Sequence, residues 1–164
     1  MIFKTQLDRV TVQIKSKDIC QGEPNVVITE HLRKLYGNVC GKYGFAIKPS
    51  IHLIERTLGK LVSVDSVSCI EYDVTYKMDA IYPATEDEYE CVIENQTKMG
   101  LIAYLDYSPD DESVSLETSP ILFIIPNQMG GDMEAKRGQK LKVSVLDSRI
   151  KYQSRQIQSV AKIV

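Results

Sequence analysis

Residues 69–83 carry the feature that most constrains this fold, a long alternation of apolar and polar side chains. From Ile70 to Tyr82 every even position is apolar or aromatic, and nearly every odd position is charged or polar. Successive side chains of a β-strand point to opposite faces of a sheet, so the pattern predicts one strand with one buried and one solvated face. At about 3.3 Å per residue this strand spans roughly 40 Å, longer than an ordinary strand. We expect it to finish one domain and deliver the chain to a second, with Pro83 closing the strand because proline has no N–H to donate.

Residues 1–82 are predicted to form an α+β domain, with one helix on an antiparallel sheet. The helix is expected to begin near Asn25 and to end at Gly37, which we expect in the left-handed conformation. Its apolar stripe consists of Ile28, Leu32, Leu35 and Tyr36. Strands are expected at residues 2–14, 51–54, 61–68 and 70–82.

Residues 83–164 are predicted to be all-β. Strands are expected at residues 89–95, 101–107, 121–125, 141–146 and 157–163. A long connection separates the third strand from the fourth, and five short strands with such a connection are typical of the oligonucleotide/oligosaccharide-binding (OB) barrel. The chain therefore divides, on this prediction, into domains 1–82 and 83–164.

Charge is distributed unevenly along the chain, although the formal net charge is only −2. Residues 71–117 hold thirteen acids against two lysines, whereas residues 134–164 hold eight cations against two acids. Either these are two solvated faces of opposite sign, or the C-terminal face meets an anion such as nucleic acid.

Several classes of protein and site are not expected from the composition. No apolar run approaches the ~18 residues of a membrane span, and residues 1–6 lack the core of a signal peptide, so we expect an intracellular protein in the nucleus or cytoplasm and no membrane partner. The four cysteines show no paired spacing, so reduced thiols are expected rather than zinc ligands, and no cofactor is expected. No nucleophile and base stand at motif spacing, and the acidic runs 86–88 and 110–112 are either solvated loops or sites for a hard cation.

The glycine-punctuated run at residues 37–47 has three glycines in its first eight positions. It lacks the spacing of a phosphate-binding loop. It is either a strand packed closely on the helix or an exposed surface held rigid for a partner.

Four motifs occur in order along the chain. They are Cys-Gly-Lys-Tyr-Gly-Phe at 40–45, the strand with Val74, Tyr76, Lys77, Ala80 and Pro83, Lys-Met-Gly-Leu-Ile-Ala at 98–103, and Phe-Ile-Ile-Pro at 123–126. By their order and spacing they resemble the stalk subunit of multi-subunit DNA-directed RNA polymerases, the seventh subunit in the eukaryotic count. That family has an N-terminal tip domain followed by an S1-type OB domain, and the resemblance covers nearly the whole chain.

The sequence departs from this family in two places. Residues 55–59 keep one glycine where the family has a glycine-rich loop, and Leu101 and Ile102 replace an aromatic pair. Because a base stacked on a ring contributes about 1–3 kcal/mol, the second change is expected to weaken RNA binding. This divergence would suit a copy carried by a large DNA virus, in which case the protein is expected in the virion and in viral transcription.

The resemblance implies a subunit that is not an enzyme on its own and that docks on the polymerase core through its tip domain. The docking residues it implies are Gly37, Gly41, Lys42, Tyr43 and Gly44. It leaves open whether a second stalk subunit pairs with this chain.

Nascent single-stranded RNA is the second partner expected, on the OB barrel. The RNA-binding candidates are Lys98, Tyr104, Arg149, Lys151, Tyr152 and Arg155, which are otherwise ordinary solvated surface. A rival interpretation is a free-standing S1-type RNA-binding factor in translation or RNA decay, which would need the aromatic platform that this chain lacks.

Overall fold

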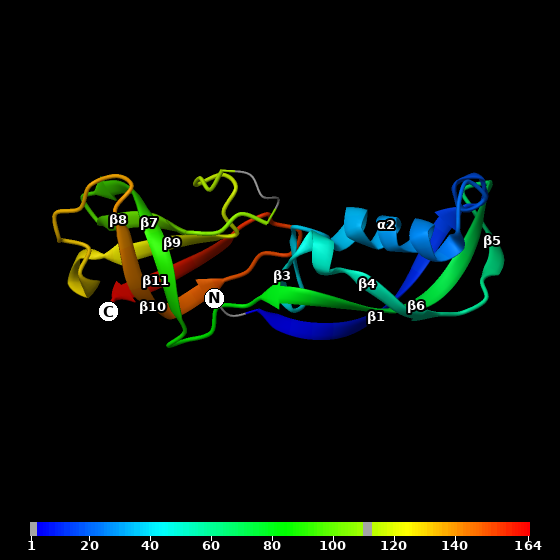
Figure 1. Cartoon of the computed structure of the whole chain (residues 1–164), viewed down its shortest axis with the longest axis horizontal. Helices are drawn as coiled ribbons and strands as arrows, with labels where there is room; N and C mark the ends of the chain where they lie inside the picture. The colour runs from blue at the N-terminus through cyan, green and yellow to red at the C-terminus, as the bar shows by residue number, and fades with distance from the viewer. Residues whose placement is uncertain (1–2, 110–112) are drawn as a thin grey trace. The chain divides into compact units, whose positions relative to one another are not determined.

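A computed structural model describes residues 3–109 and 113–164, which form two compact units (Figure 1). The sheet unit consists of Lys4–Gly37 and Ala46–Ala80. The barrel unit consists of Phe3, Asn38–Phe45 and the described part of Ile81–Val164. These units are defined by spatial proximity, and their segments alternate along the chain. They are not the same division as the domains 1–82 and 83–164, which stay a prediction.

The sheet unit is built on β6 (Val67–Ile81), the strand that the alternation predicts. On one side, β1 (Lys4–Lys15) pairs with it antiparallel without interruption from Lys4↔Ala80 to Lys15↔Cys69. On the other side, β5 (Lys60–Val64) and β4 (His52–Arg56) pair antiparallel with successive parts of it. The even residues from Tyr72 to Ala80 are buried, so the predicted face is the core face over this length.

The alternation fails at the end of β6. The strand ends at Ile81, which is fully buried, whereas Tyr82 is 47% exposed instead of buried. Pro83 cannot continue the ladder, so nothing holds the residue before it in the strand's alternating geometry.

Two α-helices occur in the sheet unit where one is expected. The long one, α2 (Pro24–Tyr36), begins where the Glu23 carboxylate accepts the Val26 N–H at 3.1 Å, and it buries Ile28 and Leu32 completely. Leu35, expected on the same stripe, is 42% exposed. The short helix α1 (Ser16–Ile19), which lies beyond the strand expected at residues 2–14 and is not predicted from the sequence, precedes it. A 3₁₀ turn, η1 (Lys48–Ser50), follows later.

Gly37 ends α2, but it is not in the left-handed conformation expected of it. Its φ and ψ are −74° and 136°, and the next residue, Asn38, has the positive φ of 56°. Position 37 requires glycine for a steric reason instead. A Cβ there would collide with the Arg33 carbonyl oxygen and lie 2.8 Å from Cβ of Lys48.

The barrel unit contains a closed, OB-like barrel of five strands, as the sequence predicts. The strands are β7 (Glu88–Thr97), β8 (Gly100–Leu105), β9 (Ile121–Pro126), β10 (Lys140–Arg149) and β11 (Ile157–Ile163). They close in the order β10-β11-β9-β8-β7, with β11 parallel to β9 and the other pairs antiparallel (Figure 1). The interior is filled by fully buried side chains such as Leu101, Phe123 and Ile157, and the 3₁₀ turn η2 (Asn127–Met129) follows β9.

A short hairpin of β2 (Cys40–Gly41) and β3 (Gly44–Ala46) occupies the glycine-punctuated run. Lys42 and Tyr43 form its turn. Among the described residues, none of the helices combines the length and the apolar character needed to cross a membrane.

Gly44 allows a test of this hairpin. Its φ is +101°, and a Cβ there would collide with the carbonyl oxygen of Ile81. We expect Gly44→Ala to lower the free energy of unfolding by at least about 1–2 kcal/mol. Gly41→Ala is the matched control, because a Cβ at Gly41 meets no atom within 4 Å. Equal urea-unfolding midpoints for the two variants would contradict the close approach at Gly44.

Candidate nucleic-acid interface

The β2–β3 hairpin is held against the loop between β10 and β11. The Cys40 N–H donates to the Ser154 carbonyl at 2.7 Å, and the Cys40 carbonyl accepts the Gln153 N–H at 2.9 Å. Cys40 is only 1% exposed, so water does not compete for these bonds. We call residues 40–45 and 150–156 the hairpin–loop surface. It brings four predicted docking residues beside three predicted RNA-binding residues.

The β10–β11 loop, which forms part of this surface, is also held by hydrogen bonds to residues 116–119. The Gln156 side-chain amide donates to the carbonyls of Leu116 at 2.7 Å and Ser119 at 3.0 Å. Within the loop, the Ser154 N–H donates to the Lys151 carbonyl at 3.0 Å. The exposed side chains between these anchors are therefore presented by an ordered backbone.

Four of the eleven predicted site residues lie elsewhere. Gly37 belongs to the sheet unit, whereas Gly41, Lys42, Tyr43 and Gly44 belong to the barrel unit. Lys98 lies in the β7–β8 turn beside the end of β9, because Gly100 pairs with Pro126. The β10–β11 loop lies beside the start of β9, where Ile157 pairs with Ile121. Lys98 and the loop are thus at opposite ends of the barrel.

Tyr104 and Arg149 share the outer face of the barrel. Tyr104 pairs with Leu122, Leu122 with Gln158, and Gln158 with Arg149. Directly paired residues project to the same face of a sheet, so these four side chains form a row across β8, β9, β11 and β10. Tyr104 is half-buried in this row and Arg149 is exposed at its end.

The next row on this face is aliphatic. Ile102 pairs with Ile124, which in turn pairs with Val160, and Ile124 is 38% exposed. Leu101 points inward and is fully buried. The positions at which the resemblance implies an aromatic pair therefore offer no ring to a base.

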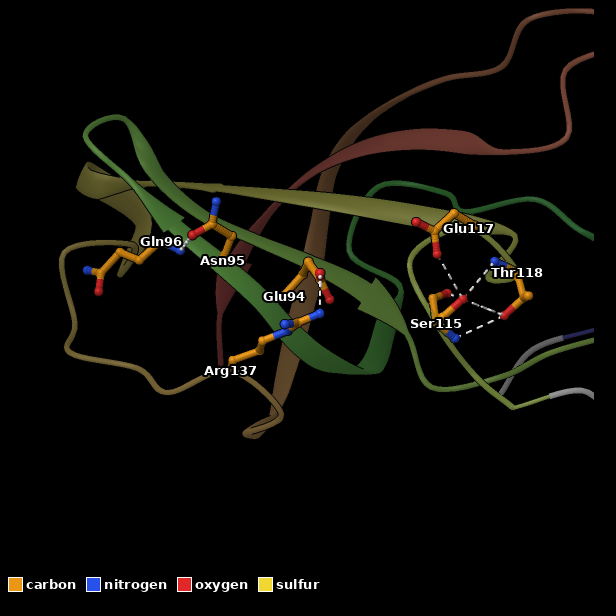
Figure 2. Close-up of polar contacts among 7 residues, drawn as sticks. All are labelled: Glu94, Asn95, Gln96, Ser115, Glu117, Thr118 and Arg137. Carbon is orange, nitrogen blue, oxygen red and sulfur yellow. Dashed lines mark hydrogen bonds and ion pairs between the residues drawn. The ribbon is translucent and has the colours of Figure 1, made fainter.

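The uneven charge of the sequence is partly cancelled in the fold. β10 pairs with β7, which places C-terminal cations beside the acids of residues 86–106. Three ion pairs result, Arg137–Glu94 at 3.1 Å, Lys140–Asp106 at 3.0 Å and Lys142–Glu88 at 2.9 Å, the first of which Figure 2 shows. Hydrogen bonds to Asp106 and Glu88 raise the pKa of Lys140 and Lys142, respectively.

The cations of the loop and of the end of β10 remain available to a ligand. Arg149, Lys151 and Arg155 are exposed, and none of them forms an ion pair within the described part of the chain. Tyr152 is 66% exposed between them. In the hairpin turn, the Lys42 ammonium lies 5.3 Å from the ring centroid of Tyr43. Positive charge and aromatic surface thus meet on the hairpin–loop surface.

Three acidic residues of the barrel unit, Asp87, Glu88 and Glu117, are engaged by the protein itself. The Asp87 carboxylate accepts the Ala84 N–H at 2.9 Å, and Glu88 pairs with Lys142. Glu117 accepts the Ser115 hydroxyl at 3.2 Å in the turn that Ser115 and Thr118 form (Figure 2). Residues 110–112 lie outside the described residues. Over the described ranges, no three His, Cys, Asp or Glu side chains gather as a metal site.

One aromatic residue of this region was missed by sequence reasoning. Tyr82, expected on the buried face of β6, lines a hollow of about 560 Å³ together with Lys42, Asp147 and Ile150. The only sequence signal for its exposure is the proline that follows it. Asp147 carries no local signal of a role in the sequence.

The sequence was compared with models of known protein families and with curated proteins, and neither comparison finds a match.

The cysteines provide a test of the barrel and hairpin cores. All four are free thiols, and burial raises the pKa of Cys40 to about 11 and that of Cys91 to about 12. Because thiolate is the reactive form, we expect iodoacetamide at pH 8 to modify the exposed Cys20 and to spare Cys40 and Cys91. Peptide mass spectrometry of native and urea-unfolded protein measures this. Labelling of Cys40 or Cys91 at the rate of Cys20 in the native protein would contradict their burial.

Proposed function

We propose that this chain is a non-catalytic, stalk-like subunit of a DNA-directed RNA polymerase that binds single-stranded RNA on its barrel unit. The resemblance of its four motifs to the tip and S1-type domains of stalk subunits supports the polymerase assignment. The observation that carries the RNA-binding part is the hairpin–loop surface of a closed OB-like barrel unit, where Lys151 and Arg155, which form no ion pair within the described residues, share a loop with the exposed Tyr152.

Phosphate neutralisation is the physical basis of this proposal. Single-stranded nucleic acid binds to proteins through Lys and Arg along a groove or face, with aromatic rings stacking on bases. Arg149, Lys151 and Arg155 provide the cations, and Tyr152 provides an exposed ring. Tyr104 lies on the outer face of the barrel, at the opposite end from Arg149 of the row that they share.

Docking on the polymerase core is assigned to the hairpin turn, with Lys42 and Tyr43 making directional contacts. The turn is a rigid support for them, because Cys40 is bonded to the loop and Gly44 approaches Ile81 closely. The sheet unit adds a second open surface, a hollow of about 690 Å³ between α2 and β4, edged by the exposed Ile54 and Leu58.

The chain offers a matched pair of variants for the docking proposal, because Lys-Tyr occurs both at 42–43 and at 151–152. We expect Lys42→Ala/Tyr43→Ala to release a tagged chain from the polymerase, since both side chains would contact the core. Lys151→Ala/Tyr152→Ala is expected to leave assembly intact. Co-purification and sedimentation of the native complex measure both. Undiminished assembly of the 42–43 variant would reject this surface, and a wild-type chain that sediments alone would favour the free RNA-binding factor.

Salt dependence tests the phosphate contacts. We expect Arg149→Ala/Arg155→Ala to reduce the slope of log affinity against log salt for single-stranded RNA by about 1.4, because each lost phosphate contact accounts for about 0.7. Arg137→Ala is the control and is expected to leave the slope unchanged, because Arg137 is already paired with Glu94. Fluorescence anisotropy with a labelled oligonucleotide gives the slopes. Equal slopes for wild type and the double variant would contradict the assignment.

A further inference from the structure

The hollow beside the hairpin–loop surface has the size of a small-molecule site. Its volume is about 560 Å³, within the range of roughly 300–1,000 Å³ that ligand pockets occupy. Three parts of the barrel unit meet there, the β2–β3 hairpin, the connection after β6 and the end of β10. Tyr82 contributes a ring that is 47% exposed, and Lys42 contributes an exposed ammonium.

Asp147 is the one acidic residue among those that line this hollow. A β-bulge in β10 precedes it, because the register with β11 shifts between Val145↔Ala161 and Asp147↔Val160. Bulges re-aim side chains and are common beside functional sites. The fold therefore departs from regular strand geometry at the residue that faces the hollow.

The carboxylate of Asp147 has hydrogen-bonding capacity to spare. One of its oxygens accepts the N–H of the adjacent Ser148 at 2.9 Å, and within the described residues it forms no ion pair. An ionised carboxylate accepts about four hydrogen bonds, so most of that capacity faces solvent. Two cations follow it closely along the chain, Arg149 and Lys151, and neither forms an ion pair within the described residues.

A carboxylate among phosphate-binding cations weakens phosphate binding by repulsion. It strengthens nucleic-acid binding by accepting hydrogen bonds from donors, which are the ribose 2′-hydroxyl, common to every nucleotide of RNA, and the N–H groups of base edges. Contacts to phosphate position the chain of nucleotides and carry no sequence information, whereas contacts to base edges select the base. In single-stranded RNA the Watson–Crick edges are free to be read in this way.

We propose that the hollow takes a nucleobase of single-stranded RNA and that Asp147 selects guanine. Guanine presents two adjacent donors, N1–H and the N2 amine, which match the two oxygens of a carboxylate. Uracil presents one donor between two carbonyl oxygens, which the carboxylate repels. Tyr82 lies against the base, and Arg149 meets a flanking phosphate. This selectivity rests on the RNA binding proposed above and adds a base preference to it.

The test compares two labelled RNA nonamers on the purified full chain, one of uridine alone and one with a single central guanosine. At low salt we expect wild type to bind the guanosine-containing strand roughly tenfold more tightly, the size of effect that one bidentate base contact provides. Asp147→Asn is expected to abolish this preference, because the amide replaces one acceptor by a donor. It should leave the all-uridine affinity equal or higher, since a charge that repels phosphate is lost.

Asp132→Asn is the matched control, because it removes the same charge from an exposed residue. Asp132 follows Gly131, whose N–H donates to the Pro126 carbonyl, so it lies at the opposite end of β9 from the β10–β11 loop. We expect this variant to keep the guanine preference. Thermal unfolding of each variant confirms that it is folded.

The outcomes separate this inference from the function on which it rests. Binding of both strands with equal affinity by wild type overturns guanine selection and leaves RNA binding standing. The role of Asp147 is overturned if Asp147→Asn keeps the preference for the guanosine-containing strand. This includes the case in which the substitution changes both affinities by the same factor. Absence of binding to either strand overturns the RNA-binding function and the guanine site together.

Discussion

Two backbone hydrogen bonds of Cys40 are the constraint on which the candidate interface depends. They join segments more than a hundred residues apart in sequence, and they are made at a residue that is 1% exposed. Backbone groups buried away from water must be paired, so a strand–loop junction of this kind resists opening. The loop of Arg155 is consequently a fixed support for cations, and a fixed support loses little conformational entropy when a ligand binds.

Acidic and basic residues that are separated along the sequence lie side by side in the fold. Residues 71–117 are acidic and residues 134–164 are basic, which by itself predicts two opposed faces. Strand pairing of β7 with β10 instead puts acids beside Lys140 and Lys142 and pairs them. Exposed ion pairs of this kind contribute little to stability. Their larger consequence is that Lys140 and Lys142 are engaged, whereas Arg149, Lys151 and Arg155 form no ion pair within the described residues.

The sequence predicts the strands well because their signals are local. Along β6, the apolar positions of the alternating pattern are the buried ones from Tyr72 to Ala80. All five barrel strands occur where short apolar runs lie between turn residues. Local patterns do not report steric contacts between distant segments, which is why Gly37 was expected in the left-handed region that Asn38 occupies. The same limit applies to the site. In the sequence, Lys98 and Arg155 are equivalent as candidate exposed cations. The register of β9 with β8 and β11 shows that they lie at opposite ends of the barrel.

The aliphatic outer row limits the kinds of contact that the barrel offers to a base. Ile102, Ile124 and Val160 occupy the face where the resemblance leads one to expect aromatic stacking, and they present apolar surface without a π-face. General affinity from stacking is therefore reduced on this unit, while phosphate contacts are indifferent to sequence. What remains for discrimination is hydrogen bonding at a base edge. Among the residues that line the barrel unit's hollow, the carboxylate of Asp147 is suited to that role because it is the one acidic group there and forms no ion pair within the described residues.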